Sequence, residues 1–188
     1  MTEGKKGFRL DWATLKLAVI LFAFAAVVAV ALGLVNKITG DRIAAFAAEK
    51  TAAAMREVLS AESYTPVEGS AAEKIELVKK VYAAGDKGWV IMVAPSGFGG
   101  EIDMAVGVDK SGAVTGVSIV QMSETSGLGA NAKRESFRSQ YVGRSGSVAL
   151  RKQGGEINAL TGATVTSTAV TKGVNAALAA AAELIRGA

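Results

Sequence analysis

The sequence predicts an α+β protein in which one N-terminal transmembrane helix is followed by a mixed, mainly antiparallel sheet domain with flanking helices. Three observations predict this class. Residues 17–35 form an unbroken apolar run, residues 74–122 contain four apolar segments separated by turn sequences, and residues 164–185 show apolar positions at helical spacing. Closely spaced strands joined by hairpin-type turns favour antiparallel pairing, so the domain is expected to be α+β.

The apolar run Leu17–Val35 is predicted to be a membrane anchor. As an α-helix it would be about 28 Å long, which is close to the thickness of the bilayer hydrocarbon. The hydrophobic region of a signal peptide is shorter, roughly 7–15 residues, and the cleavage-like string Ala29-Val30-Ala31 lies inside the run. The sequence therefore predicts a retained single-pass anchor, preceded by a tail over residues 1–16 and followed by a domain over residues 36–188.

The charges around the run predict its orientation. Residues 1–16 carry four basic and two acidic side chains, and an excess of basic residues favours the cytoplasmic side of a membrane. Basic residues behind the run reduce this difference: Lys37, Arg42 and Lys50. The expected topology places residues 1–16 in the cytoplasm, residues 17–35 in the cell (inner) membrane and residues 36–188 in an extracytoplasmic domain.

Composition excludes several kinds of chemistry. The chain contains no histidine and no cysteine, which excludes a Ser-His-Asp or Cys-His nucleophile pair, a cysteine-bound iron–sulfur cluster and a His-ligated zinc or haem. The net charge is +4 without a basic cluster, so nucleic acid is not an expected partner. If the protein handles electrons, its redox group must be organic and held by other side chains.

The remaining elements are predicted from periodicity and turn residues. Residues 41–59 are expected to form an amphipathic helix, and residues 131–141 a short helix. Turn residues separate four predicted strands, notably at Gly85-Asp86 and in the segment 109–112. The predicted strands are Lys74–Ala83, Gly88–Ala94, Ile102–Asp109 and Ala113–Met122.

A run of hydroxyl residues, Leu160–Thr168, opens the last helix-like segment. The N-terminus of a helix carries unpaired backbone N–H groups and a partial positive charge, which makes it a natural seat for a phosphate. Gly162 lets the backbone turn sharply, and Thr164, Thr166 or Ser167 can each cap the helix or present a hydroxyl to a phosphoryl group. The residues by themselves predict either an anion site or a plain helix cap.

The string Thr161–Thr166 resembles the Ser/Thr-Gly-Ala-Thr-x-Thr flavinylation motif of the FMN-binding domain family. That family includes the G subunit of Rnf-type ion-translocating electron-transport complexes and the C subunit of the sodium-pumping NADH–quinone reductase. The resemblance implies that Thr166 is joined to the phosphate of FMN through a phosphoester bond, and that residues 36–188 form an FMN-binding domain. It also implies a cofactor-binding role for four preceding residues: Thr161, Gly162, Ala163 and Thr164.

Two earlier loops are also similar to segments of this family. The loop Ser123–Gly129 is similar to Glu-Thr-Pro-Gly-Leu-Gly, and the segment Gly97–Ile102 resembles Gly-Tyr-Gly-Gly-x-Ile. From the residues alone, a plain strand-to-helix connection is an equally good interpretation of the first loop, and a flexible hairpin loop is the better interpretation of the second. The resemblance implies a scaffold role for the second loop and direct FMN contacts from the first, by Glu124, Thr125, Leu128 and Gly129.

The sequence departs from the family pattern at two positions. Ser126 stands where the family has proline, so the loop backbone is less constrained there. Asn158 stands three residues before Thr161, where the family usually has aspartate. Asparagine keeps a hydrogen-bonding oxygen but lacks the negative charge, so a modifying enzyme that needs this charge would attach FMN slowly or not at all.

The resemblance implies an electron-relay subunit of a membrane ion-translocating oxidoreductase, with covalent FMN as its cofactor. Its expected partners are the other membrane and redox subunits of the complex, and a flavin transferase that acts on Thr166 during maturation. No residue is expected to catalyse substrate turnover. Two alternatives remain: a regulatory membrane flavoprotein outside any ion pump, and a non-redox binding or scaffold domain on a membrane anchor, in which the hydroxyl run is only a cap.

Overall fold

The computed structural model describes residues 12–187 and confirms the predicted α+β class. The chain divides into two compact units, residues 1–47 and residues 48–188. Of the predicted tail, residues 1–11 lie outside the described part of the chain. The helix α1, Trp12–Val58, supplies the described part of the first unit and contributes its last turns to the second.

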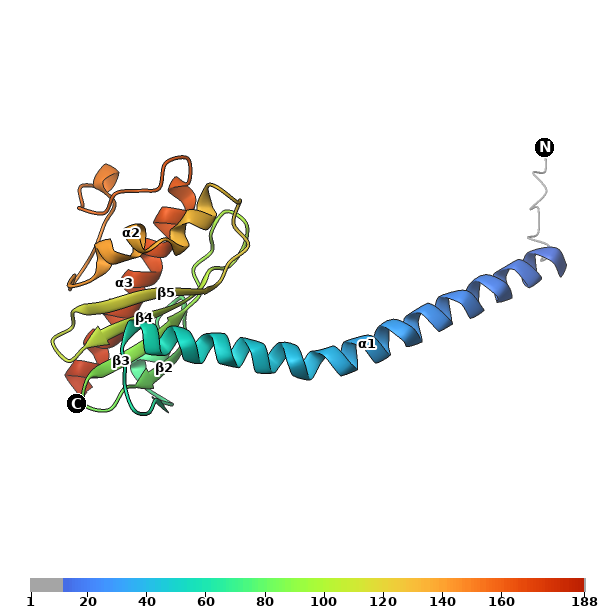
Figure 1. The fold of residues 1–188 in the computed structure, drawn as a ribbon, viewed down its shortest axis with the longest axis horizontal. Coiled ribbons are helices and arrows are strands. Elements are labelled where there is room, and N and C mark those ends of the chain that lie inside the picture. The colour runs from blue at the N-terminus through green and yellow to red at the C-terminus, as the bar shows by residue number, and fades with distance from the viewer. Residues whose placement is uncertain (1–11, 188) are drawn as a thin grey trace, which may run out of the picture. The chain divides into compact units, whose positions relative to one another are not determined.

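Helix α1 is one continuous helix where the sequence predicts two (Figure 1). The residues that join the two predicted segments, 36–40, are helical as well. They contain no proline, and a single glycine inside a helix costs only about 1 kcal/mol, so nothing in this stretch ends the helix. Within residues 12–187, α1 is the one helix that is long and apolar enough to cross a membrane, and none of its most apolar stretch is buried.

The second unit is built on a five-stranded antiparallel sheet whose strands follow one another in chain order. The sequence predicts four of these strands, and the fifth is a two-residue edge strand that contains a proline, as edge strands tolerate. The first predicted strand starts later than expected, because residues 71–74 form a 3-10 turn and Leu77 adopts a positive φ of 75°. The strands are β1 (Thr65–Pro66), β2 (Val78–Ala83), β3 (Gly88–Val93), β4 (Asp103–Asp109) and β5 (Val114–Gln121).

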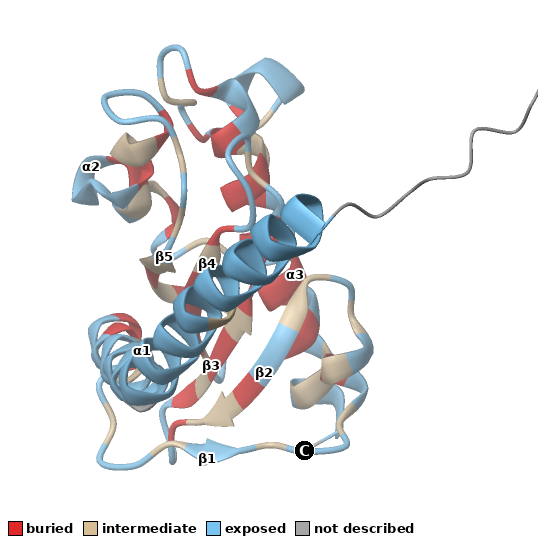
Figure 2. Ribbon diagram, turned by 90° about the vertical axis from the view of Figure 1, so that its right-hand side faces the viewer, coloured by how far each residue is buried: buried red, intermediate tan, exposed pale blue. Residues whose placement is uncertain are grey.

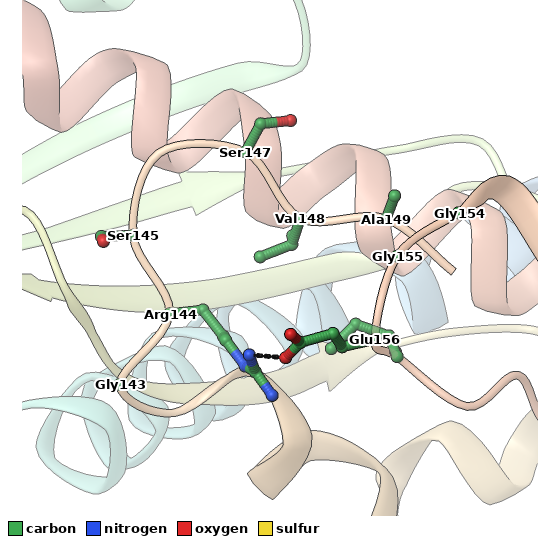
Figure 3. Close-up of a pocket in the computed structure, with 10 residues that line it drawn as sticks. Gly143, Arg144, Ser145, Ser147, Val148, Ala149, Gly154, Gly155 and Glu156 are labelled. Atoms are coloured by element: carbon green, nitrogen blue, oxygen red, sulfur yellow. Dashed lines mark hydrogen bonds and ion pairs between the residues drawn. The ribbon is translucent and has the colours of Figure 1, made fainter. Parts of the chain in front are cut away.

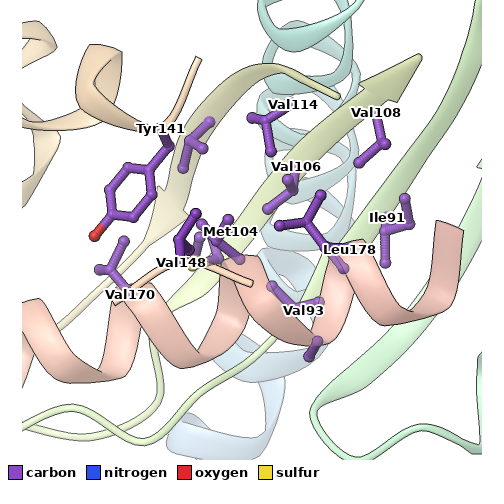
Figure 4. Packing of buried hydrophobic residues seen from close by; sticks show 14 of the residues in the cluster. Ile91, Val93, Met104, Val106, Val108, Val114, Tyr141, Val148, Val170 and Leu178 are labelled. Carbon is purple, nitrogen blue, oxygen red and sulfur yellow. The ribbon is translucent and has the colours of Figure 1, made fainter. Parts of the chain in front are cut away.

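Helix α3, Thr164–Gly187, covers one face of this sheet. Because side chains alternate between the two faces of a strand, every second residue of β3 and β4 points towards α3. Apart from the partly buried Trp89, these strand residues are fully buried and meet the valine and leucine side chains of the helix (Figure 4). The main core residues on this face are Ile91, Val93, Met104, Val106, Val108, Val170, Val174 and Leu178.

The last turns of α1 pack on the opposite face of the sheet (Figure 2). Met55 and Val58 form a small buried cluster there with Val90 and Ala105, which are alternate residues of β3 and β4. The sheet is therefore covered on both faces. This explains why its central strands are apolar at nearly every position instead of alternating with polar residues.

A long excursion, residues 122–163, connects β5 to α3. In place of the helix predicted over residues 131–141 there are three short pieces. Arg134, whose backbone is extended with ψ of 138°, separates the first from the second, and the third follows the second directly. Phe137 and Tyr141 anchor the pieces in the core through an edge-to-face contact at 5.7 Å. The pieces are η2 (Gly129–Lys133), α2 (Glu135–Arg138) and η3 (Ser139–Tyr141), and a further turn, η4 (Arg151–Gln153), follows.

Candidate functional site

A cavity of about 390 Å³ lies where α3 begins, and its volume falls within the usual range of small-molecule sites. Three segments that are far apart in the sequence line it: the loop between β3 and β4, the loop after β5, and the start of α3. Its lining residues are Phe98, Glu124, Thr125, Leu128, Gly129, Gly162, Ala163, Thr164, Val165 and Thr166.

The start of α3 supplies backbone donors to this cavity. The first helical hydrogen bond of the segment runs from the Ser167 N–H to the Ala163 carbonyl, at 3.0 Å. The N–H groups of Thr164, Val165 and Thr166 come before it, so they have no carbonyl of their own helix to bind. The helix therefore presents three donors and the positive end of its dipole where the cavity lies.

The hydroxyl groups of the run have different partners. Ser167 donates to the Ala163 carbonyl and accepts from the Leu160 N–H, both at 2.9 Å, and Thr168 donates to the Thr164 carbonyl at 2.8 Å. These bonds hold the helix and the preceding turn together. Thr166 instead donates across the cavity to Glu124 Oε2, at 2.7 Å. Thr166 is thus the hydroxyl of the run that is directed to another segment of the site.

Glu124 joins the three segments of the cavity. Its Oε2 atom accepts the Thr166 hydroxyl, while its Oε1 atom accepts the backbone N–H groups of Phe98 and Gly99 at 2.8 and 3.1 Å. Glu124 is also the one charged side chain among the residues that line the cavity. A phosphate bound here would therefore rely on the helix N-terminus for neutralisation, since the cavity lining contains no lysine or arginine.

Two glycines are required by this close packing. A Cβ atom on Gly129 would lie 2.5 Å from Glu124 Oε2 and 2.7 Å from Thr166 Oγ1, which is closer than real Cβ contacts. Gly162 has a positive φ of 74°, and a Cβ atom there would lie 3.0 Å from the Leu128 side chain. Gly129 and Gly162 thus let the loop after β5 and the start of α3 approach each other.

The rim of the cavity is apolar and exposed. Phe98 is 73% exposed, Val165 54% and Leu128 44%, although all three line the same cavity. Exposed large apolar side chains grouped around a pocket are typical of a ligand or protein contact. Phe98 and Val165 were not among the predicted site residues. A phenylalanine set between glycines in a loop, and a valine between two threonines, are the sequence signals that indicate them.

The structure brings together eight of the nine predicted cofactor-binding residues. They line one cavity, with Thr166 almost completely buried at 1% exposure. The ninth, Thr161, is exposed and lies outside the lining, one residue before the Gly162 turn. Among residues 12–187 there is no cluster of acidic residues suited to a metal ion. The eight are Glu124, Thr125, Leu128, Gly129, Gly162, Ala163, Thr164 and Thr166.

Asn158 lies on the approach to the Gly162 turn and is exposed. Its backbone N–H and its side-chain amide both donate to Gln140 Oε1, at 2.8 and 3.2 Å, and its carbonyl accepts from Gln140 Nε2 at 3.3 Å. The asparagine is therefore bound to η3, an earlier part of the same excursion. An aspartate here would keep the two backbone contacts if the Gln140 amide stayed in place, but it would bring a carboxylate close to Gln140 Oε1.

Buried hydroxyl groups support the start of α3 from within the core. Tyr141 and Thr171 share a hydrogen bond of 2.8 Å, and Thr171 donates to the Ser167 carbonyl at 2.8 Å. Burial raises the pKa of Tyr141 to about 12, and the bond to Thr171 only partly offsets that effect. The tyrosine therefore stays protonated at neutral pH and acts as a fixed hydrogen-bonding partner.

Two other cavities lack the predicted site residues. One, of about 470 Å³, lies in the loop 143–157, where Arg144 forms an ion pair with Glu156 (Figure 3). The other, of about 460 Å³, is lined by residues that include Glu76, Leu77 and Lys172. Neither combines a hydroxyl with the first turn of a long helix, so the cavity at Thr166 remains the candidate site.

Comparison with known proteins gives matches over most of the chain. Residues 97–179 match the FMN-binding domain family, and residues 7–58 match the RnfG N-terminal region. The G subunit of the Na(+)-translocating ferredoxin:NAD(+) oxidoreductase complex of Acetobacterium woodii is 35% identical over 92% of this chain and 94% of its own length. The G subunit of the ion-translocating oxidoreductase complex of Methanosarcina acetivorans is 30% identical over 87% and 92%, respectively.

Among solved structures, the C subunit of the Na(+)-translocating NADH-quinone reductase from Parabacteroides distasonis is similar to this chain, with a TM-score of 0.46 and 20% identity. The similar region covers 57% of this chain and 61% of that protein. The sequence relatives span nearly the full chain, and the matched FMN-binding domain contains the whole cavity at Thr166. The chain therefore belongs to the FMN-binding domain family, among the G subunits of Rnf-type ion-translocating oxidoreductase complexes.

Proposed function

We propose that this protein is an electron-relay subunit of a membrane ion-translocating oxidoreductase and that it carries FMN through a phosphoester to Thr166. Family membership supports the first part, since the relatives are named as subunits of such complexes. The single observation that carries the second part is the Thr166 hydroxyl, which lies in the lining of the cavity on the first turn of α3. FMN supplies the redox chemistry of such a subunit, because it can accept and donate electrons one at a time.

The residues around Thr166 fit an FMN phosphate and ring. The N–H groups at the start of α3 suit a phosphate diester that carries one negative charge, and Gly162 lets the preceding turn approach it closely. The exposed side chains of Phe98, Leu128 and Val165 offer an apolar surface to a flat ring. In this proposal Thr125 and Gly129 contact the cofactor, and Thr161 acts through the shape of the turn.

We also propose its partners and its place in the cell. Helix α1 would hold the protein in the cell membrane through residues 17–35, and the other membrane and redox subunits would exchange electrons with the flavin. A flavin transferase would form the bond to Thr166, as the resemblance of residues 161–166 to the flavinylation motif implies. The protein itself would turn over no substrate.

The proposed orientation depends on charge alone. The basic tail before residue 17 favours the cytoplasm, so the domain over residues 36–188 would lie outside it. A reporter that is active only outside the cytoplasm, fused after the last residue, should be active, and the mature chain should begin near Met1. A reporter active only in the cytoplasm, or a mature chain that begins near Leu32, would contradict this topology.

The attachment is tested by replacing the hydroxyl. The full-length protein is co-expressed with an active flavin transferase, and a flavin-fluorescent band that survives denaturation is sought, with a mass gain of one FMN less one water. Thr166→Val keeps nearly the same shape but has no hydroxyl, so the band should disappear while the protein stays folded. Thr166→Ser, which keeps a hydroxyl, should retain part of the signal.

Thr164→Val is the matched control, because Thr164 lines the same cavity two residues earlier. It should reduce the yield at most partly, since the acceptor oxygen is still present. A band that persists in Thr166→Val would place the flavin on another residue. An unlabelled wild-type protein would contradict covalent attachment, and non-covalent FMN binding would then be measured directly.

A further inference from the structure

The Thr166 hydroxyl is enclosed by two residues of the β5 loop. Its proton is donated to Glu124 Oε2 at 2.7 Å, and the backbone of Gly129 lies against both oxygens, so closely that a Cβ atom would meet each of them below 3 Å. Thr166 is 1% exposed. In this conformation a donor molecule cannot reach the oxygen without a movement of the loop.

The hydrogen bond to Glu124 can exist only before attachment. When the phosphoester forms, the O–H bond of Thr166 breaks and an Oγ–phosphorus bond forms, while the phosphoanhydride bond of an activated flavin such as FAD breaks and its AMP portion departs as the leaving group. The proton passes to a base. The Thr166 oxygen then has no proton to donate, and it bears a diester whose negative charge lies next to the carboxylate.

Two negative groups at this separation repel each other, and the cavity lining contains no cationic side chain to separate them. The repulsion therefore drives the carboxylate away from Thr166. If it moves, its other oxygen also leaves the N–H groups of Phe98 and Gly99, which it holds at 2.8 and 3.1 Å. Attachment at Thr166 would thus free the loop that forms one side of the rim.

We propose that Glu124 acts as a latch on Thr166: it holds the acceptor hydroxyl before modification, slows phosphoester formation, and releases the Phe98 loop once FMN is attached. This inference rests on the proposed covalent attachment. Glu124 is a positioning residue here, since it acts through Thr166 and through the loop. The charge of Glu124 is the feature that makes the contact incompatible with the product.

Glu124→Gln tests the latch. The glutamine oxygen can still accept the two loop N–H groups, while its NH₂ group then faces Thr166 and donates to its oxygen. The Thr166 proton is no longer held, and the repulsion in the product is removed. Attachment should become faster by about tenfold, the factor expected when a hydrogen bond to a charged group is replaced by a neutral one.

The rate is measured with the purified full-length protein in detergent, a purified flavin transferase and FAD as donor, by the growth of the FMN mass shift. Glu101→Gln is the matched control, because Glu101 follows the same loop but pairs with Lys79 at 3.5 Å on the exposed surface. Its attachment rate should equal that of the wild type.

A second measurement needs no variant. Amide hydrogen exchange at Phe98 and Gly99 should be slow in the unmodified wild-type protein and faster after FMN attachment. Amide exchange that is unchanged by attachment overturns the latch alone, and so does an attachment rate of Glu124→Gln equal to or below that of the wild type. A Glu124→Gln protein that is labelled more slowly than the wild type would make Glu124 an aid to attachment. Absence of label on the wild type and on both variants overturns the covalent attachment itself, and the latch with it.

Discussion

Gly107 and Gly116 are register partners in β4 and β5, and the backbone of Val58 at the end of α1 lies over both of them. A Cβ atom on Gly107 would lie 2.6 Å from the Val58 carbonyl oxygen, and one on Gly116 would lie 2.9 Å from the Val58 Cα. Thr115 donates to the same carbonyl at 2.6 Å. This glycine pair lets the end of α1 dock on the sheet.

Gly107→Ala is therefore expected to destabilise the second unit. The added methyl group would strike the Val58 carbonyl and the Thr115 hydroxyl, so the helix end or the strand must shift. Overpacking of this kind costs typically about 1–3 kcal/mol. The free energy of unfolding is measured by chemical denaturation of the full-length protein in detergent micelles.

Gly40→Ala is the control for this substitution. A Cβ atom on Gly40 has no heavy atom within 4 Å, and the residue lies inside α1, so alanine should leave the stability unchanged or raise it slightly. A Gly107→Ala protein as stable as the wild type would mean that α1 does not need this close approach.

Gly129→Ala and Thr125→Ala are expected to change the properties of the flavin in different degrees. Both residues line the cavity, but a methyl group on Gly129 must displace Glu124 or Thr166, whereas removal of the Thr125 hydroxyl leaves the backbone in place. The midpoint potential should shift by about 30 mV in Gly129→Ala, which corresponds to about 1.4 kcal/mol for a two-electron couple, and less in Thr125→Ala. Spectroelectrochemical titration measures both shifts.

Ser126→Ala is the control in the same loop, because Ser126 is exposed and is not part of the cavity lining. Its flavin spectrum and potential should match those of the wild type. If Gly129→Ala and Thr125→Ala also match the wild type, this loop is only a scaffold.

Asn158→Asp is expected to accelerate FMN attachment by severalfold. It restores the charge that the family usually carries at this position, and the site is exposed, so a modifying enzyme can contact it. Either the carboxylate faces Gln140 Oε1, or the Gln140 amide rotates and gives up its two contacts with the residue 158 backbone, so the free energy of unfolding should fall by about 1 kcal/mol. Asn158→Ala removes the side chain without adding charge and serves as the control. Equal attachment rates in the aspartate and asparagine proteins would show that the charge is not used.

Asp109 gives the stability a dependence on pH. Hydrogen bonds from the Ser111 hydroxyl and from the backbone N–H groups of Ser111 and Ala113 hold the pKa of Asp109 below its ordinary value, and they outweigh the small effect of burial. Because the pKa is lowered in the folded state, the ionised carboxylate stabilises the fold above about pH 4, and this stabilisation is lost as the pH falls through the folded-state pKa.

Asp109→Asn should therefore lower the free energy of unfolding at pH 7 by at most about 1 kcal/mol, since the turn is largely exposed to solvent. The difference from the wild type should shrink as the pH falls below about 4. Denaturation curves at neutral, mildly acidic and strongly acidic pH measure it. A difference that stays constant over this range would assign the effect to the turn geometry and not to the charge.

The sequence by itself determines most of the fold class. Apolar runs with turn residues between them are local signals, and they indicate the strands β2–β5, the helix α3 and the long apolar helix. The sequence does not predict the two-residue strand β1, because so short an edge strand has no hydrophobic periodicity. It also does not predict the break at Arg134 or the positive φ of Leu77, because neither residue is a glycine or proline that would signal such a backbone.

The sequence also indicates most of the lining of the candidate site, because the glycines and hydroxyls of two loops stand in a family-like order. It cannot say which hydroxyl is distinct. Ser167, Thr168 and Thr166 are similar in chemistry, and the first two donate to carbonyls four residues earlier, whereas the partner of Thr166 depends on how α3 meets the β5 loop.

The contact between Glu124 and Thr166 was decided by the tertiary structure alone. The two residues are 42 positions apart, and no local pattern brings a carboxylate to a helix N-terminus across that distance. They meet because β5 directs its following loop over the start of α3, and because Gly129 leaves room for both oxygens. The sequence specifies the residue types, but the distance between the Glu124 carboxylate and the Thr166 hydroxyl is set only when separate elements pack together.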